Sequence, residues 1–153
     1  MKKLFFVLAL AIVSAASFAQ APSNIQSTFS AKYPDVTGAT WTTDDGNYVA
    51  AYTDKNGMHN WVVFDKDARI VRNEVELDMK EYPATVKEYY VNKYPDEKNY
   101  RVYSITDENG DKTYYVPSES KGVRYYFDKT GNFLREEKNK MKEEIKEHTD
   151  HDK

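Results

Sequence analysis

The chain has 153 residues, a formal net charge of −3 and no cysteine. The lack of cysteine excludes structural disulfides and a lipid anchor on a cysteine. The mildly acidic balance, without a basic stripe, argues against nucleic acid or an anionic membrane as a partner. Aromatic residues are frequent, with 13 Tyr, 7 Phe and 2 Trp, and so many tyrosines favour strands and interfaces.

The N-terminus has the layout of a secretory signal peptide. Lys2 and Lys3 precede an apolar run at 4–13, and small residues follow up to Ala19. This run is shorter than the roughly 20 apolar residues of a membrane-spanning helix. The sequence therefore predicts a signal peptide over residues 1–19 and no membrane span. We expect an exported protein, periplasmic or extracellular, whose mature chain begins at Gln20.

The rest of the chain contains an internal repeat. The sequence Phe-Ser-Ala-Lys-Tyr-Pro-Asp at 29–35 is matched by Tyr-Val-Asn-Lys-Tyr-Pro-Asp at 90–96, 61 residues further on. At a spacing of 63 residues, three further matches are Phe-Asp-Lys 64–66 with 127–129, Arg72 with Arg135, and Glu74 with Glu137. Such a period indicates two copies of one structural unit. The predicted modules span 20–78 and 79–137, followed by a charged tail over 138–153.

Each copy begins with a predicted helix. In the first, Ser23 and Gln26 have the spacing of a capping box, and in the second, Pro83 suits the first helical turn. Apolar residues spaced by four form one face of each helix: Ile25, Phe29 and Tyr33 in the first copy, and Val86, Tyr90 and Tyr94 in the second. Both helices are expected to end at Lys-Tyr-Pro, because a residue before proline avoids helical geometry.

Four strands are predicted after each helix, since aromatic and β-branched segments alternate with turn sequences. The segments are 40–43, 48–53, 60–64 and 70–77 in the first copy, and 100–106, 113–116, 123–127 and 133–136 in the second. Short connections, two of them with Asn-Gly, make neighbouring strands antiparallel. We expect an α+β fold of two tandem modules, each a helix plus a four-stranded antiparallel meander. The modules join into one eight-stranded sheet with the helices on one face.

Helices ending in Lys-Tyr-Pro, an aromatic strand, a hairpin, Phe-Asp-Lys and a short last strand together resemble the PepSY-like family, also described as β-lactamase-inhibitor-like. The resemblance covers both copies, residues 23–137. It implies a secreted bacterial protein with the architecture of a protein inhibitor of β-lactamase and without catalytic residues. Related PepSY domains are thought to restrain peptidases, but such a target rests on fold analogy alone. The first copy departs from the family's glycine turn, with Asp67-Ala68 in place of Thr130-Gly131.

The chain lacks the residue patterns of nucleophilic catalysis. It has no Cys and no Gly-x-Ser-x-Gly elbow, and His59 is the one histidine outside the tail. Glu74 and Glu76 share a strand face as a glycosidase pair would, but a solvated strand face explains them better. We therefore expect no enzyme and no cofactor.

Metal binding is also disfavoured. The segments 54–57 and 107–111 resemble calcium loops but lack the remaining ligands of an EF-hand, and both lie where a hairpin turn is required. In the tail, His148, Asp150 and His151 stand in a charged segment that we expect to be a frayed helix or disordered. The sequence predicts no metal site.

The candidate partner site lies on the sheet of the second copy. Its strands carry aromatic residues at both alternating positions, so the face away from the helices should expose some of Tyr103, Tyr115 and Tyr126, with Arg101 and Arg124 as a polar rim. The alternative remains that tyrosine is simply a good strand residue whose ring lies over its neighbours.

The favoured function is an exported binding module that holds a protein or peptide on this open aromatic face. Two alternatives are an inhibitor of a secreted or periplasmic hydrolase or peptidase, and a structural envelope protein that associates with itself.

We expect both tryptophans, Trp41 and Trp61, to lie in the core, since large aromatic side chains usually dominate cores.

Overall fold

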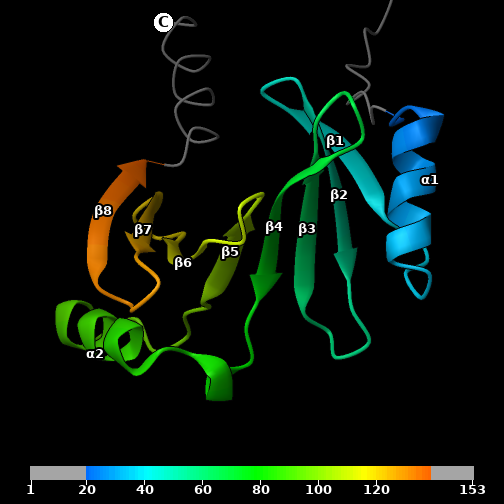
Figure 1. Cartoon of the computed structure of the whole chain (residues 1–153). Helices are drawn as coiled ribbons and strands as arrows, with labels where there is room; N and C mark the ends of the chain where they lie inside the picture. Colours follow the sequence, from blue (N-terminus) through cyan, green and yellow to red (C-terminus); the bar gives the residue numbers. More distant parts are fainter. Residues whose placement is uncertain (1–19, 139–153) are drawn as a thin grey trace, which may run out of the picture.

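A computed structural model describes residues 20–138, so the predicted signal peptide and nearly all of the predicted tail lie outside the described residues. Each half contains one α-helix and four strands (Figure 1). The first half contains α1 (Ser23–Lys32), β1 (Thr40–Asp44), β2 (Asn47–Thr53), β3 (His59–Phe64) and β4 (Ile70–Glu76). The second contains a short 3-10 helix, η1 (Met79–Glu81), then α2 (Ala84–Lys93), β5 (Tyr103–Asp107), β6 (Lys112–Ser118), β7 (Val123–Phe127) and β8 (Phe133–Lys138). None of the described helices is long and apolar enough to cross a membrane.

The strands form one sheet in sequence order from β1 to β8, and every neighbouring pair is antiparallel. This confirms the predicted α+β fold with one continuous eight-stranded meander. The pairing of β4 with β5 joins the two halves, with Arg72 opposite Asp107 and Glu76 opposite Tyr103.

Both helices cover the same face of the sheet, which we call the helix face. Val62 on β3 packs in the cluster under α1. It is opposite Asn73 on β4, which is opposite Thr106 on β5, so all three residues lie on the same face. Ser104 shares the face of Thr106, because it lies two residues away, and pairs with Tyr114, which packs in the cluster under α2. The opposite face bears neither of the described helices, and we call it the open face.

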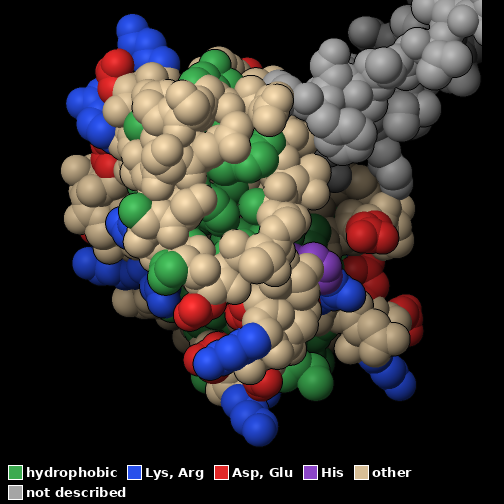
Figure 2. Space-filling view, turned by 90° about the vertical axis from the view of Figure 1, so that its right-hand side faces the viewer, with side chains coloured by type: hydrophobic (Ala, Val, Ile, Leu, Met, Phe, Trp, Pro, Cys, Tyr) green, Lys and Arg blue, Asp and Glu red, His purple; other side chains and the backbone are tan. Residues whose placement is uncertain are grey.

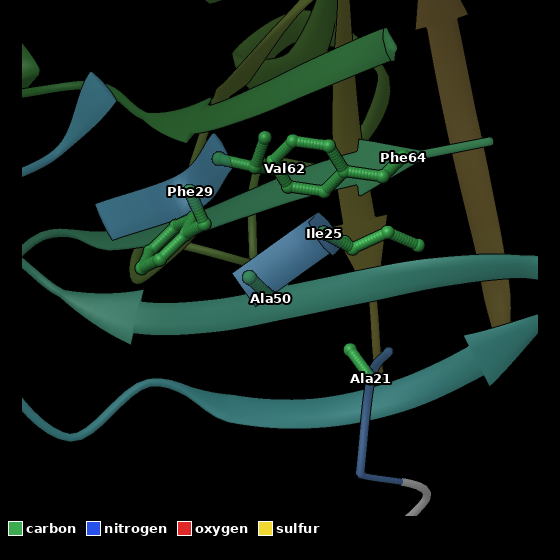
Figure 3. Packing of buried hydrophobic residues seen from close by; sticks show 6 residues of the cluster. All are labelled: Ala21, Ile25, Phe29, Ala50, Val62 and Phe64. Carbon is green, nitrogen blue, oxygen red and sulfur yellow. The ribbon is translucent and has the colours of Figure 1, made fainter. Parts of the chain in front are cut away.

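The first core lies between α1 and strands β2 and β3. Ile25 and Phe29 of α1 lie against Ala50, Val62 and Phe64 (Figure 3), and all five are at most 4% exposed. The i, i+4 spacing of the helix residues produces this single buried stripe. Seen from the side of α1, hydrophobic side chains gather in the middle of the molecule, and charged side chains lie toward its margins (Figure 2).

The second core repeats this arrangement with larger side chains. Val86 and Tyr90 of α2 pack against Val116, Tyr125 and Phe127, and each of the five is at most 1% exposed. The two cores are separate clusters, and between them the helix face carries polar residues. The hydroxyl of Tyr33 donates to Oδ1 of Asn73 at 3.2 Å, and Asn60 and Ser104 are buried. The halves are therefore joined by the β4–β5 ladder and by contacts on the open face.

Two corresponding turns differ in a way that the sequence indicates. Ala68 and Gly131 follow β3 and β7 at matched positions, and both have a positive φ, 62° and 85°. This conformation is strained for alanine. The Gly131 turn also packs on α2, where Thr85 Oγ1 donates to the carbonyl of Thr130 at 2.8 Å. A Cβ on Gly131 would lie 1.9 Å from Thr85 Oγ1, which is too close.

Some local predictions were wrong. Ser23 is the first helical residue rather than a cap, and Gln26 donates to the carbonyl of Ala21 instead of completing a capping box. Strand β5 begins at Tyr103, while Tyr100 packs against the second core. Strand β8 extends to Lys138, two residues further than predicted.

Candidate partner-binding face

A row of rings crosses the open face from β3 to β7. Its members are His59, Trp61, Tyr103, Tyr115 and Tyr126. Their ring centroids are 6.1 Å apart for His59–Trp61, 5.6 Å for Trp61–Tyr103, 4.9 Å for Tyr103–Tyr115 and 5.8 Å for Tyr115–Tyr126. The register explains the row, because Tyr103 is directly opposite Tyr115, and Tyr115 is opposite Tyr126. The structure therefore brings together the three predicted tyrosines.

Their exposure differs from the simple expectation. Tyr103 and Tyr115 are 7% and 4% exposed, whereas Tyr126 is partly exposed. The rings of Tyr103 and Tyr115 are stacked with an interplanar angle of 12°, so each ring covers the other. Tyr103 and Tyr115 thus form a packed floor, and Tyr126 is the predicted tyrosine that solvent reaches most easily.

Glu74, opposite Trp61 across β3 and β4, is buried, so the expectation of a solvated strand face is wrong for it. The hydroxyl of Tyr115 donates to Glu74 Oε2 at 2.9 Å, and Arg72 Nε lies 2.8 Å from Oε1. Burial raises the pKa of the Tyr115 hydroxyl, and the negative charge of Glu74 raises it further. Tyr115 therefore remains a neutral donor that satisfies a buried carboxylate.

A second polar cluster joins the halves at the β4–β5 junction. Glu76 Oε2 lies 2.5 Å from Nδ1 of His59, and Arg101 Nε lies 3.5 Å from Glu76 Oε1. Burial raises the pKa of Glu76, but hydrogen bonds from His59 and the charge of Arg101 outweigh it, so the net shift is downward. Arg101 reaches the tyrosine row through a hydrogen bond with Tyr103 and is engaged with this carboxylate, and its role as a polar rim stays a prediction.

Next to Tyr126 the open face is hollowed. The hollow has a volume of about 370 Å³ and lies over β4 to β8. Arg124 and Arg135 line it, with their guanidinium carbons 5.3 Å and 4.5 Å from the ring centroids of Tyr115 and Tyr126. Burial lowers the pKa of Arg124, but the hydroxyls of Tyr126 and Tyr115 raise it, and the net shift is upward. Arg124 therefore carries its positive charge within an aromatic surface.

The two segments that resemble calcium loops are hairpin turns. Oδ1 of Asp54 accepts from the backbone N–H groups of Asn56 and Met58, and Oδ1 of Asp107 accepts from those of Asn109 and Asp111. These carboxylates thus stabilise their own turns. Among residues 20–138 no group of three His, Asp or Glu side chains is placed to hold a metal ion. The predicted tail residues His148, Asp150 and His151 lie outside the described range.

Sequence reasoning missed several side chains of this face. Trp41 packs against the first core as expected, but Trp61 lies on the open face, so the prediction of a core position was wrong. The alternation of β3 carries the signal, because Asn60, Val62 and Phe64 face the helices and Trp61 must face away. Arg72 and Arg135 could have been found from the repeat, because they are matched residues 63 apart. Arg135 is opposite Tyr126 and therefore lies on the same face as the tyrosines.

Comparison with known proteins supports the fold. No protein-family profile and no curated protein sequence matches the chain. A solved DUF2874 family protein from Bacteroides uniformis is 22% identical, with a TM-score of 0.63 over 77% of this chain and 89% of that one. A Bacteroides eggerthii protein, provisionally described as periplasmic, is 23% identical, with a TM-score of 0.64 over 77% of this chain and 88% of that one.

A BLIP-like protein from Bacteroides fragilis is 21% identical, with a TM-score of 0.54 over 79% of this chain and 88% of that one. BLIP-like here means similar to the β-lactamase inhibitor protein. These similarities establish a BLIP-like α+β fold for the chain. Membership of the PepSY-like family remains a prediction, because identities of 21–23% show the fold alone.

Proposed function

We propose that the chain is an exported, non-enzymatic binding protein that holds a protein or peptide on the open face of its second half. The observation that carries the proposal is the hollow beside Tyr126, where aromatic rings and arginines meet on a face that neither described helix covers. Tyrosine and arginine are among the residues that dominate binding energy in protein interfaces.

The arrangement also provides a rigid base for binding. Tyr115 is held by its stacked neighbour Tyr103 and by its hydrogen bond to Glu74, so little side-chain entropy remains to be lost when a partner docks. Tyr126 and Arg124 then present partly exposed groups above this base. Preorganised aromatic anchors favour specific association.

A narrower version is an inhibitor of a secreted or periplasmic hydrolase or peptidase. The observation that favours it is the structural similarity to a BLIP-like protein, and export is supported by similarity to a protein provisionally described as periplasmic. Both supports rest on shared fold, so the class of target is left to experiment.

Self-association as a structural envelope protein is the weaker alternative. Strand β8, the last strand of the described sheet, carries Arg135, Glu136, Glu137 and Lys138 in succession. Charged residues along an exposed edge oppose the pairing of that edge with another chain.

Affinity capture tests the proposal. The immobilised mature protein is exposed to a native envelope extract, and bound proteins are identified by mass spectrometry. We expect one stoichiometric partner, with capture reduced by Tyr126→Val and unchanged by Val91→Ser, a control on the exposed surface of α2. Recovery of further copies of the chain alone would support the structural alternative, and equal capture by both variants would contradict a role for the open face.

A further inference from the structure

We propose that the hollow beside Tyr126 is a subsite for a carboxylate, and that the partner inserts an aspartate or glutamate side chain there. This inference rests on the proposed function and names the chemistry of the partner. The hollow is lined by ten residues, which include three arginines and two glutamates, Arg72, Arg124, Arg135, Glu74 and Glu137. Its charged groups therefore sum to +1, within a chain whose net charge is −3.

The pairing of these groups leaves one arginine over. Arg72 lies 2.8 Å from Glu74, and Arg135 lies 2.6 Å from Glu137. Arg124, in contrast, lies within ion-pair distance of no described carboxylate, although it is opposite Glu137 across β7 and β8 and lines the same hollow. Its neighbours are the ring of Tyr115, whose centroid is 5.3 Å away, and the hydroxyl of Tyr126. The unmatched charge of the hollow is thus the guanidinium of Arg124.

The internal repeat shows how this imbalance arises. Arg72 and Glu74 on β4 recur 63 residues later as Arg135 and Glu137 on β8, and both copies form the same ion pair. At this spacing Arg124 corresponds to Trp61, so the first half has no counterpart of this arginine. The two repeated ion pairs plus Arg124 leave the hollow with one surplus positive charge.

A carboxylate fits this site better than other ligands. The oxygens of Glu74 are engaged by Arg72 and Tyr115, and Glu137 is engaged by Arg135, so the hollow offers little to a cation. The planar fork of arginine binds carboxylates through two parallel hydrogen bonds. A single surplus positive charge matches one carboxylate, whereas a phosphate group carries about −1.5 to −2 at neutral pH. Arg124 is partly buried, and partial removal from water strengthens its interaction with an opposite charge.

The experiment uses random peptides displayed on phage and selected against the immobilised mature protein. We expect enriched peptides to share one acidic residue next to apolar or aromatic ones. A synthetic copy of the best peptide is then compared with the same peptide in which the acid is replaced by its amide. The wild-type protein should bind the acidic peptide about tenfold more tightly, the scale of a hydrogen bond to a charged group.

Variants of the protein identify the residue. Arg124→Gln should abolish the preference for the acidic peptide, and Arg124→Lys should retain part of it, because the charge remains without the planar fork. Arg69→Gln removes an exposed arginine that does not line the hollow, and it should leave the preference unchanged. Thermal unfolding of each variant shows whether the fold is intact, and Arg124→Lys keeps the test decisive if Arg124→Gln fails to fold.

The failures are distinguishable. Peptides enriched without an acidic residue, or an acidic preference that survives Arg124→Gln or falls equally with Arg69→Gln, would overturn the carboxylate subsite and leave the proposed function standing. If no peptide is enriched, the subsite and the peptide-binding version of the proposed function are contradicted, and capture from the envelope extract decides the protein-binding version.

Discussion

The two halves are alike on the helix face and different on the open face. Under the helices, Phe64 and Phe127 occupy matched positions in the two cores. On the open face of the same strands, Trp61 and Val63 in the first half correspond to Arg124 and Tyr126 in the second. A helix must be supported in both halves, so the helix face is alike in both, whereas the open face is under no such constraint and differs between them.

The comparison also separates two roles within the tyrosine row. Trp61 contacts Tyr103, and Glu74 accepts from Tyr115, so these contacts tie the first half to the second on the open face. The two hydrophobic cores are separate clusters, so these side-chain contacts on the open face link the halves instead. Tyr103 and Tyr115 are therefore part of the framework, and Tyr126 with Arg124 is the part that the proposed partner would contact.

The strongest test of the common helix face is removal of matched core rings. Phe29→Ala and Tyr90→Ala should each lower the free energy of unfolding by about 3–5 kcal/mol, because both side chains are buried under a helix. Chemical denaturation measures the effect. A loss below about 1 kcal/mol, the range of surface substitutions, would show that one half does not depend on its core.

The matched turns should respond in opposite directions. Gly131→Ala should cost about 2–3 kcal/mol, since it places a side chain at positive φ and displaces the hydrogen bond of Thr85. Ala68→Gly should instead stabilise by about 0.5–1 kcal/mol, because it relieves strain at the corresponding position. Thermal unfolding of the two variants side by side gives the comparison, and effects of the same sign would contradict it.

The framework role of the tyrosine row predicts a smaller effect. Tyr115→Phe keeps the stacked ring but leaves the buried carboxylate of Glu74 without one donor, which should cost about 1–3 kcal/mol. Tyr126→Phe, on the partly exposed ring, should change the free energy of unfolding by less than about 0.5 kcal/mol. Equal changes in the free energy of unfolding for the two variants would contradict the distinction between the buried Tyr115 and the partly exposed Tyr126.

The smallest effect concerns acid stability in the β7–β8 turn. Hydrogen bonds from Thr130 and Asn132 lower the pKa of Asp128 from 3.8 to about 2. Because the pKa is lower in the folded protein, the stabilisation is complete above pH 4 and is lost as the pH falls toward 2. Asp128→Asn should therefore reduce the loss of stability between pH 4 and 2, as measured by thermal unfolding. An unchanged pH dependence would show that the turn carboxylate does not contribute.

Much of the fold can be predicted because local and repeated signals agree. The Lys-Tyr-Pro sequences predict both helix ends, and the aromatic segments with intervening turns predict all eight strands in order. The site is harder to predict. The strand alternation places Tyr103 and Tyr115 on the open face, but their burial depends on stacking between their rings on neighbouring strands. The position of Trp61 depends on β-strand register, and the burial of Glu74 depends on a tyrosine 41 residues away.

The central claim is that the open face of the second half binds a partner above a packed aromatic floor. Its most direct test is the affinity of the captured partner for the double variant Arg124→Gln/Tyr126→Val. The matched control, Arg69→Gln/Val91→Ser, also removes one arginine and one hydrophobic side chain but lies off the hollow. We predict that the double variant unfolds within about 1 kcal/mol of wild type and binds at least tenfold more weakly, the scale of one interface hot spot, while the control binds normally. Unchanged affinity of the folded double variant would contradict the claim.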